Sequence, residues 1–180
     1  MKAILHELMQ KKALELELRQ KIYLLLAKSP GLHFREIQRR TKTATGQLTY
    51  HLNYLQKANL IKTLGDGEYL RYYADIQISD KERKVLELMR QKSIRHILLY
   101  LLEYKRCNHE QLVKSSNLSP STISWHINKL VDRKIVKKEI AGRNSLYSIN
   151  DFELVMKTLV KYRESFLDKL VDRFIEMWET

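Results

Sequence analysis

The sequence predicts a mainly α-helical fold with small β-hairpins, in which one module occurs twice in tandem. The 180 residues include only 5 glycines and 2 prolines, which favours helices joined by short turns. Apolar residues recur at three- and four-residue spacing in several segments, as expected for one face of a helix. A stretch in the first half of the chain also resembles a stretch in the second half at a constant distance.

The internal repeat has an offset of 75 residues. The stretch TGQLTYHLNYLQKANLIKT at 45–63 aligns without a gap with PSTISWHINKLVDRKIVKK at 120–138. His51 falls on His126, and the other matched positions are mainly apolar, glycine or helix-face residues. A repeat found only twice indicates a pair of domains, because a solenoid needs at least three units.

Each copy, over 20–75 and 95–150, predicts the order helix, helix, helix, β-hairpin. Glycine-containing turns between β-branched and aromatic residues indicate the hairpins. In the second copy Ser119 is a suitable N-cap, whereas the first copy has Ala44 there and needs a weaker cap or one from Thr43. The predicted helices span 19–28 and 93–104, then 33–40 and 108–115, then 44–58 and 119–133, and the hairpins span 60–74 and 135–149.

The segments outside the two copies are predicted to be helical. Residues 2–18 form an amphipathic stretch, residues 79–92 form a connecting helix capped at Ser79 or Asp80, and residues 151–178 form one long amphipathic helix. The long helix either covers the modules or mediates self-association as a homodimer. The predicted domains are 1–78 (N-terminal helix and first module), 79–150 (connecting helix and second module) and 151–180 (C-terminal amphipathic helix).

The charge distribution points to a polyanionic partner. The net charge is +12. Residues 20–78 carry 9 basic and 4 acidic groups (net +5), and residues 93–150 carry 10 and 4 (net +6). Residues 151–180 carry 5 basic and 7 acidic groups (net −2). A positive excess confined to the modules favours nucleic acid as the partner, while a solvated basic surface is the simpler alternative.

The third helix of the second copy, within LSPSTISWHINKLVDRKIV at 118–136, has two different faces. Ile123, Ile127 and Leu130 form an apolar face that would fix the helix to its module. The other face combines short hydroxyl side chains, flat rings and a cation, which suit close contact with base edges and phosphates. The DNA-contact candidates on this helix are Ser121, Thr122, Trp125, His126 and Lys129. Trp125 could instead belong to the core.

The module order and the sequence of the third helix resemble the winged helix-turn-helix of ArsR- and MarR-like transcription regulators. The resemblance covers about 110 of the 180 residues. It implies that the third helix enters the major groove of double-stranded DNA and that the hairpin, or wing, reaches the flanking backbone or minor groove. Two tandem copies look like regulators found in archaea, some of which recruit the basal transcription machinery.

The two copies differ in their expected contacts. The second has several cations on and after its third helix and Arg143 at its wing tip, which could enter a narrow minor groove. The first has Asp66 and Glu68 in its wing, which would repel phosphate. The first copy therefore either reads bases through its third helix or serves partly as a scaffold. Its candidate contacts are Gln47, Tyr50 and His51 on the third helix and Arg39 and Arg40 before it.

Other functional classes find little support. His51 and His126 share a register, but no Cys, Asp or Glu lies near them at ligand spacing, so we expect no metal and no cofactor. No phosphate-binding glycine loop or nucleophile motif indicates an enzyme. Cys107 is the single cysteine, which fits a cytoplasmic protein. No apolar run approaches the ~20 residues of a membrane span.

The sequence therefore predicts a sequence-specific, double-stranded DNA-binding transcription regulator with recognition helices at 44–58 and 119–133. The alternative is a tandem winged-helix module for protein–protein assembly, as in chromosome segregation or basal transcription complexes, because the fold alone does not define the function.

Overall fold

The computed structural model of the chain divides into two compact units, Met1–Ile78 and Ser79–Thr180. It describes residues 12, 16–65, 69–75, 78–142 and 144–179. The helix predicted over 2–18 lies, for most of its length, outside the described residues, as do Asp66, Glu68 and Arg143.

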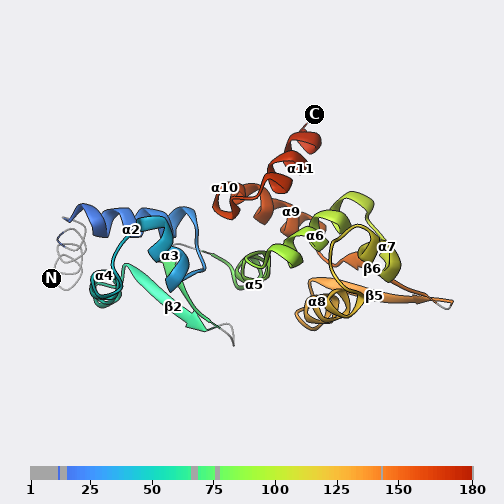
Figure 1. Ribbon diagram of the computed structural model, residues 1–180, viewed down its shortest axis with the longest axis horizontal. Helices are drawn as coiled ribbons and strands as arrows, with labels where there is room; N and C mark the ends of the chain where they lie inside the picture. The colour runs from blue at the N-terminus through green and yellow to red at the C-terminus, as the bar shows by residue number, and fades with distance from the viewer. Residues whose placement is uncertain (1–11, 13–15, 66–68, 76–77, 143, 180) are drawn as a thin grey trace. The chain divides into compact units, whose positions relative to one another are not determined.

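The first unit is built from helices and one antiparallel three-stranded sheet (Figure 1). Its described elements are α2 (Glu17–Lys28), β1 (Leu32–His33), α3 (Phe34–Thr41), α4 (Thr45–Lys57), β2 (Ile61–Gly65) and β3 (Leu70–Ala74).

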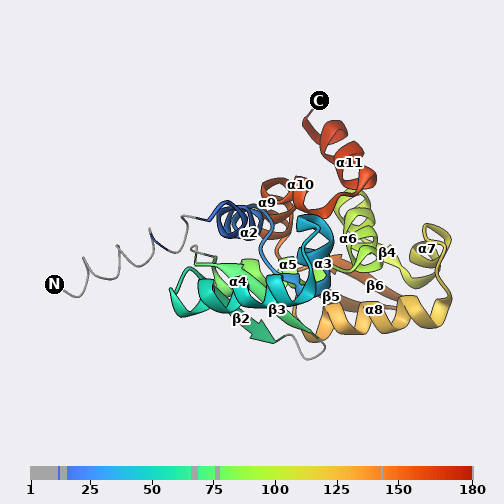
Figure 2. The same cartoon turned by 60° about the vertical axis from the view of Figure 1, so that its left-hand side comes forward.

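The second unit repeats this order and adds helices at both ends (Figure 2). The repeated part comprises α6 (Lys92–Tyr104), β4 (Cys107–Asn108), α7 (His109–Lys114), α8 (Pro120–Asp132), β5 (Val136–Ala141) and β6 (Asn144–Ile149). The added helices are α5 (Asp80–Met89), α9 (Phe152–Lys161), α10 (Arg163–Phe166) and α11 (Lys169–Glu179).

The 75-residue repeat of the sequence is a repeat of structure. Helix α4 begins at Thr45 and α8 at Pro120, and each has 13 residues. The strands β2 and β5 begin at Ile61 and Val136, again 75 residues apart. The predicted fold class, mainly α with two tandem three-helix-plus-wing modules, is confirmed.

Each sheet contains a short strand that the sequence did not predict. β1 pairs with β3, with Leu32 opposite Tyr72, and β4 pairs with β6, with Cys107 opposite Tyr147. The strand orders are β1-β3-β2 and β4-β6-β5. A strand of two residues is too short to give an alternating pattern, so these strands have no periodic signal.

Helix caps explain several boundaries. Ser119 Oγ accepts a hydrogen bond from the Thr122 amide at 3.2 Å, and Pro120 occupies the first helical position. Ser79 caps α5 in the same way, accepting from Glu82. Ala44, at the start of α4, makes no side-chain cap, which agrees with the weaker start predicted for this helix.

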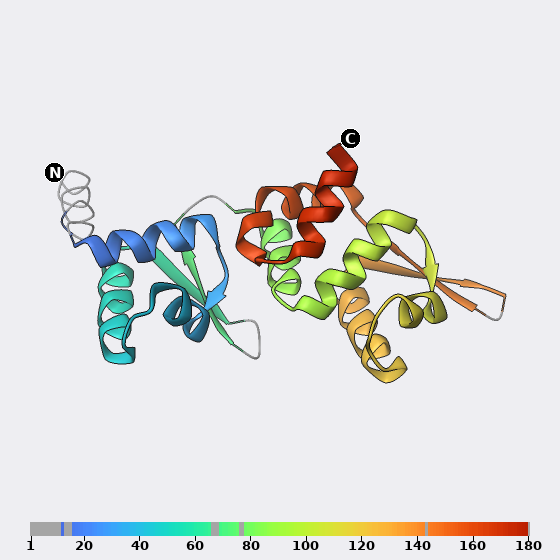
Figure 3. The same cartoon turned by 45° about the horizontal axis from the view of Figure 1, so that its top comes forward.

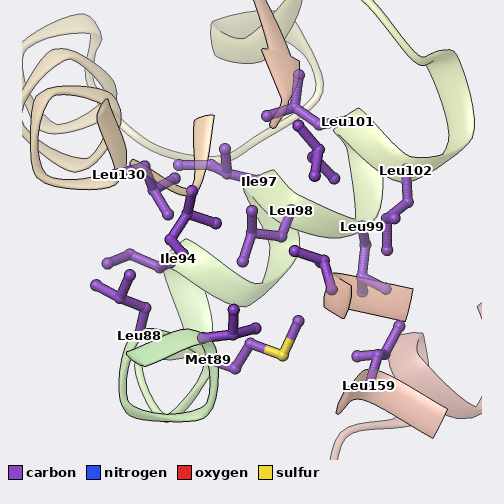
Figure 4. Close-up of a cluster of buried hydrophobic side chains, with 14 of the residues drawn as sticks. Leu88, Met89, Ile94, Ile97, Leu98, Leu99, Leu101, Leu102, Leu130 and Leu159 are labelled. Carbon is purple, nitrogen blue, oxygen red and sulfur yellow. The ribbon is translucent and has the colours of Figure 1, made fainter. Parts of the chain in front are cut away.

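The core of the second unit is centred on α6. Leu98 and Leu101 are fully buried in this helix, and Figure 4 shows α6 side chains beside Leu130 of α8 and Leu159 of α9. The core therefore fixes α8 on one side of α6 and the C-terminal helices on another.

The prediction of one long helix over 151–178 is wrong. The chain forms α9, α10 and α11 instead, with Leu167 in the left-handed region at φ 52°. Asp168 follows, accepts hydrogen bonds from the Arg95 side chain at 2.8 and 2.5 Å, and bonds the Leu170 amide at 3.2 Å. This buried ion pair holds the break against α6.

The C-terminal helices belong to the second unit and form no separate domain. α9 packs against α5, and α11 packs against α6 (Figure 3). Val155, Val171 and Ile175 are buried in the same core as α6 and α8. The sequence left two roles open for this segment, covering the modules or self-association. The segment does cover the module of its own unit.

Within the described part of the chain, none of the helices combines the length and the apolarity needed to span a bilayer.

Candidate nucleic-acid interface

Helix α8 buries one face and exposes the other, as its sequence predicts. Ile123, Ile127 and Leu130 are at most 1% exposed and lie in the core of the second unit. Ser121, Trp125 and the helix residues farther along the same side are exposed or half-exposed. The buried face fixes the helix rigidly, so the exposed side chains present a defined surface.

The first turn of α8 carries a cluster of hydroxyl groups. Ser119 Oγ lies 2.9 Å from Ser121 Oγ and 2.8 Å from Thr122 Oγ1, in addition to capping the helix. Hydroxyls both donate and accept hydrogen bonds, and the helix N-terminus favours an anion. This turn can therefore bind a phosphate oxygen or a base edge.

Trp125 and Lys129 form one polar–aromatic surface. The Trp125 side chain is 52% exposed, and Lys129 Nζ lies 5.0 Å from the centroid of its ring. The sequence left open whether Trp125 lies in the core, and the structure puts it on the surface. An exposed indole beside a lysine can pack on a sugar or a thymine methyl while the ammonium contacts a phosphate.

His126 does not lie on this surface, which corrects the sequence-based prediction. Its residue exposure is 6%, and its ring lies edge-on to Trp125 at 5.0 Å between centroids. Burial, and then the charge of Lys129, lower the pKa of this imidazole. A buried neutral ring cannot reach a base edge without moving.

The second wing, β5 to β6, carries cations along its exposed side. Lys137 and Lys138 are exposed, and Lys137 Nζ lies 3.4 Å from Glu139 Oε1. Arg133 and Lys134 are exposed just before the wing. The predicted contact Arg143 lies outside the described residues.

Helix α4 presents a different surface in the first unit. Gln47 is exposed and Tyr50 is 57% exposed, so both predicted contacts face solvent. A Cβ placed on Gly46 would meet no atom within 4 Å, so the backbone of this first turn is open to close approach by a ligand. Gly46 was not among the predicted contacts, although the repeat aligns it with Ser121.

His51 is buried, like His126, and again corrects the prediction of a contact residue. It is 6% exposed, and Arg19 Nε donates a hydrogen bond to its Nδ1 at 3.3 Å. The Arg19 guanidinium also lies 3.6 Å from the centroid of the Tyr54 ring. Burial and then the Arg19 charge lower the pKa of His51.

The two arginines of α3 have separate roles. Arg39 and Arg40 both bind Glu36, at 2.6 and 2.8 Å. Burial raises the pKa of the Glu36 carboxyl, but the hydrogen bonds and charges of the two arginines outweigh it and leave the pKa below its ordinary value. The Arg39 side chain is 72% exposed, whereas that of Arg40 is 15% exposed and also contacts Ser29 at 3.3 Å. Arg40 is therefore turned into the module, contrary to its prediction as a contact.

The described residues contain no group of three or more His, Cys, Asp or Glu side chains placed to hold a metal ion. Cys107 is buried, and burial raises the pKa of its thiol. A thiol in this state is a poor nucleophile and a poor metal ligand.

Two further polar residues of α8 were not among the predicted contacts, namely Ser124 and Asn128. His109 of α7 bonds Ser124 of α8 at 2.9 Å and ties the two helices together. Asn128 is exposed on α8 and aligns with Asn53, which is exposed on α4. The same residue type at equivalent positions of the two repeats was the sequence feature that could have marked the two asparagines.

Comparison with known proteins agrees with this architecture. Residues 16–86 match a family model described as an N-terminal HTH domain, and residues 90–137 match one described as winged helix-turn-helix DNA-binding. An uncharacterised HTH-type transcriptional regulator of Methanocaldococcus jannaschii is 34% identical over 143 residues. That match covers 79% of this chain and 36% of the relative, so the chain spans about a third of the relative's length.

Similar solved structures include reduced HlyU from Vibrio cholerae, at 22% identity and a TM-score of 0.41, covering 46% of this chain and 86% of that one. An ArsR family transcriptional regulator is similar at 15% identity and a TM-score of 0.36, covering 58% of this chain and 96% of that one. The family models, together with the geometry above, establish two tandem helix-turn-helix domains, each with a wing.

Proposed function

We propose that this protein is a sequence-specific, double-stranded DNA-binding transcription regulator, in which α8 and α4 enter the major groove. The observation that carries the proposal is the exposed face of α8, which combines hydroxyls, an indole and a lysine on a helix whose other face is held in the core. The winged-helix match over residues 90–137 supports it. Such a regulator would act in the cytoplasm, on the chromosome.

Charge favours DNA over an assembly role. The net charges of +5 over residues 20–78 and +6 over residues 93–150 account for most of the total of +12. A module that binds only proteins has no need of a positive excess in both units. A cationic surface attracts DNA through release of condensed counterions.

We assign the main contact to the second unit. The contacts to bases and phosphates would come from Ser121, Thr122, Trp125 and Lys129 of α8. The wing would reach the flanking backbone, and Arg143 stays a predicted contact from the sequence. In the first unit Gln47, Tyr50 and Arg39 are the proposed contacts. We do not propose His51, His126 or Arg40, because all three are turned into their modules.

We also propose that the chain forms a homodimer through its C-terminal helices. Several apolar side chains of this segment remain exposed although the segment covers its own unit. Among them are Val160, Leu167 and Trp178. Exposed apolar residues grouped on adjoining helices are a usual feature of a subunit interface.

The DNA proposal is tested by titrating duplex DNA at 50 and 200 mM salt. If both units engage, roughly 6–10 phosphate contacts should weaken binding about 10³- to 10⁵-fold over this range. Affinity that is equal at both salt concentrations would contradict the proposal and favour the assembly module.

The dimer is tested by sedimentation at tens of micromolar protein. Deleting 151–180 is unsuitable, because Val155, Val171 and Ile175 belong to the core. Leu167→Asn is better, since the side chain is 70% exposed and asparagine tolerates the left-handed backbone. A dimeric wild type that Leu167→Asn weakens supports the interface, and a monomeric wild type refutes it.

A further inference from the structure

The second unit contains an open cavity of about 990 Å³ where α6, the turn between α7 and α8, and α11 meet. One part of its wall is apolar, with Ile97, Tyr100, Leu118 and Phe174. Its size is at the upper end of the ~300–1,000 Å³ that is usual for small-molecule sites. All of its lining residues lie within the second unit.

The cavity touches the DNA-contacting helix through His126. This side chain lines the cavity, its residue is 94% buried (6% exposed), and its Nδ1 has no hydrogen-bond partner among the described residues. Gln91, which begins the α6 side of the cavity, likewise has a buried Oε1 without a partner. Buried polar atoms are usually hydrogen-bonded, so two such atoms on residues that line the cavity leave hydrogen bonds for a ligand to make.

The equivalent place in the first unit is satisfied by the chain itself. Arg19 donates to His51 Nδ1 at 3.3 Å, and the repeat aligns Arg19 with Ile94. Ile94 is fully buried and has no hydrogen-bonding group to offer His126. The histidine of the second unit therefore lacks the partner that the first unit supplies, and it has a cavity beside it.

The remaining charged groups indicate the kind of ligand. Lys92 and Arg173 line the cavity with positive charge, against the single carboxylate of Glu103. An anionic oxygen could accept a hydrogen bond from the Nδ1–H tautomer of neutral His126. The apolar wall, including the flexible side chain of Met177, would bury a hydrocarbon or aromatic body.

We infer that this cavity binds a small amphipathic organic anion, and that the bound anion acts on α8 through His126. The ligand's negative group meets Lys92, Arg173 and His126, and its apolar body packs between α6 and α11. The effect on DNA rests on the function proposed above, whereas ligand binding does not.

Binding is tested on the whole protein without DNA, with octanoate as the probe. Octylammonium has the same chain and the opposite charge, and butyrate has the same charge and a shorter chain. Octanoate should bind about tenfold or more tighter than octylammonium and about 10- to 100-fold tighter than butyrate. Calorimetry gives the affinities, and the ¹⁵N side-chain resonances of His126 should shift with octanoate.

Substitutions locate the site. Met177→Glu places a negative charge on a residue that is 67% exposed, so the fold should survive, and it should weaken octanoate about tenfold or more. Leu24→Glu is the matched control, because Leu24 is 48% exposed in the first unit and does not line the cavity. Equal octanoate affinity in both variants, or octylammonium bound as well as octanoate, would overturn the inference.

The link to DNA is tested separately. Saturating octanoate should change the affinity of the wild type for DNA by about 5- to 150-fold, and His126→Gln should reduce that change. Octanoate that binds and shifts His126 but leaves DNA affinity unchanged overturns the action on α8. A protein that binds octanoate but no DNA refutes the proposed function and leaves the ligand site supported. If a second copy covers the cavity, Met177→Glu lowers the mass in solution and octanoate does not bind, which also overturns the inference.

Discussion

The two units have a histidine at equivalent positions, His51 in α4 and His126 in α8, but its hydrogen bonding differs between them. In the first, Arg19 crosses from α2 to bond His51 and covers Tyr54, so the inner side of α4 is closed by the chain. In the second, Ile94 replaces the arginine, and His126 lies beside a cavity with Nδ1 free of a partner among the described residues. A duplicated module can thus keep its fold and diverge in one buried contact.

The outer surfaces differ as well. α8 combines a hydroxyl cluster and Trp125 with cations that continue into the wing. α4 exposes Gln47, Tyr50 and the bare backbone of Gly46. We infer that most cations beside the reading helix and wing come from the second unit, whereas the first unit adds Arg39 to the neutral contacts of α4.

The largest expected effect is loss of a core residue, and it should be confined to one unit. Ile127→Ala should destabilise the second unit by about 2–5 kcal/mol, because it leaves a cavity in a well-packed core. Leu52→Ala, at the equivalent position, should do the same to the first unit. Trp125 and Trp178 are the two tryptophans of the chain, so urea unfolding followed by tryptophan emission reports the second unit.

In that measurement Ile127→Ala should lower the urea midpoint seen by tryptophan emission. Leu52→Ala should lower only the urea midpoint seen by circular dichroism, which reports both units. An equal shift of the emission midpoint in both variants would show that the two units unfold together.

The next effect concerns the internal partner of His51. Arg19→Leu should cost about 1–3 kcal/mol of the first unit's stability, because it leaves a buried ring nitrogen without its hydrogen bond. Hydrogen exchange of the α4 amides measures this cost. Lys21→Leu, at an exposed position of the same helix, is the control and should stay within about 0.5 kcal/mol. Unchanged α4 protection in Arg19→Leu would mean that the contact adds no stability.

A smaller effect should appear on acidification. Burial, and then the nearby cation, hold the pKa of both His51 and His126 below the ordinary value of 6.5. The unfolded chain therefore binds more protons just below pH 6.5. Stability should be complete above this value and fall as the pH drops toward the lowered folded pKa.

His126→Gln should flatten the pH dependence of stability measured by tryptophan emission. His51→Gln should flatten it only when unfolding is followed by circular dichroism of the whole chain. Asp168 contributes to the pH dependence of stability at a lower pH than the histidines. Burial raises the pKa of its carboxyl, but Arg95 outweighs that and lowers it, so its contribution is lost below pH 3.8. An unchanged slope between pH 7 and 5 in His126→Gln would contradict the assignment.

The smallest effect concerns individual phosphate contacts. Lys138→Gln and Arg133→Gln should each reduce the slope of log affinity against log salt by about 1 and weaken all duplexes alike. Lys157→Gln is the control, because Lys157 is an exposed lysine of α9 that pairs with Glu153 of the same helix. A slope that changes equally in all three variants would indicate general charge rather than a contact.

The sequence was sufficient for the elements that depend on local patterns. The repeat, the caps at Ser119 and Ser79, and the buried stripe of α8 all follow from spacing and residue type. The break at Leu167 does not, because the apolar stripe continues across it and the break depends on Asp168 meeting Arg95 from α6. Contacts that join distant segments leave no periodic signal.

The contact residues show the same limit. Ser121 was placed correctly on the exposed face from helical spacing, and Trp125, which the sequence left open between core and surface, is exposed too. His126 was not, because it lies near the edge of that face, where packing by α6 and the α7–α8 turn decides whether a side chain is covered. Arg40 was misjudged because it also reaches Ser29 at the end of α2, whereas Arg39 binds the same Glu36 and stays exposed.

The most direct test of the account is to select the preferred duplex from a random pool and then measure each variant on that duplex and on a scrambled one. Thr122→Ala should lose about 1–3 kcal/mol of preference for the selected duplex, with binding to the scrambled duplex nearly unchanged. Gln47→Ala should reveal whether α4 also reads sequence. If the wild type shows a preference that Thr122→Ala and Trp125→Ala both retain in full, α8 is not the reading helix and the central claim is wrong.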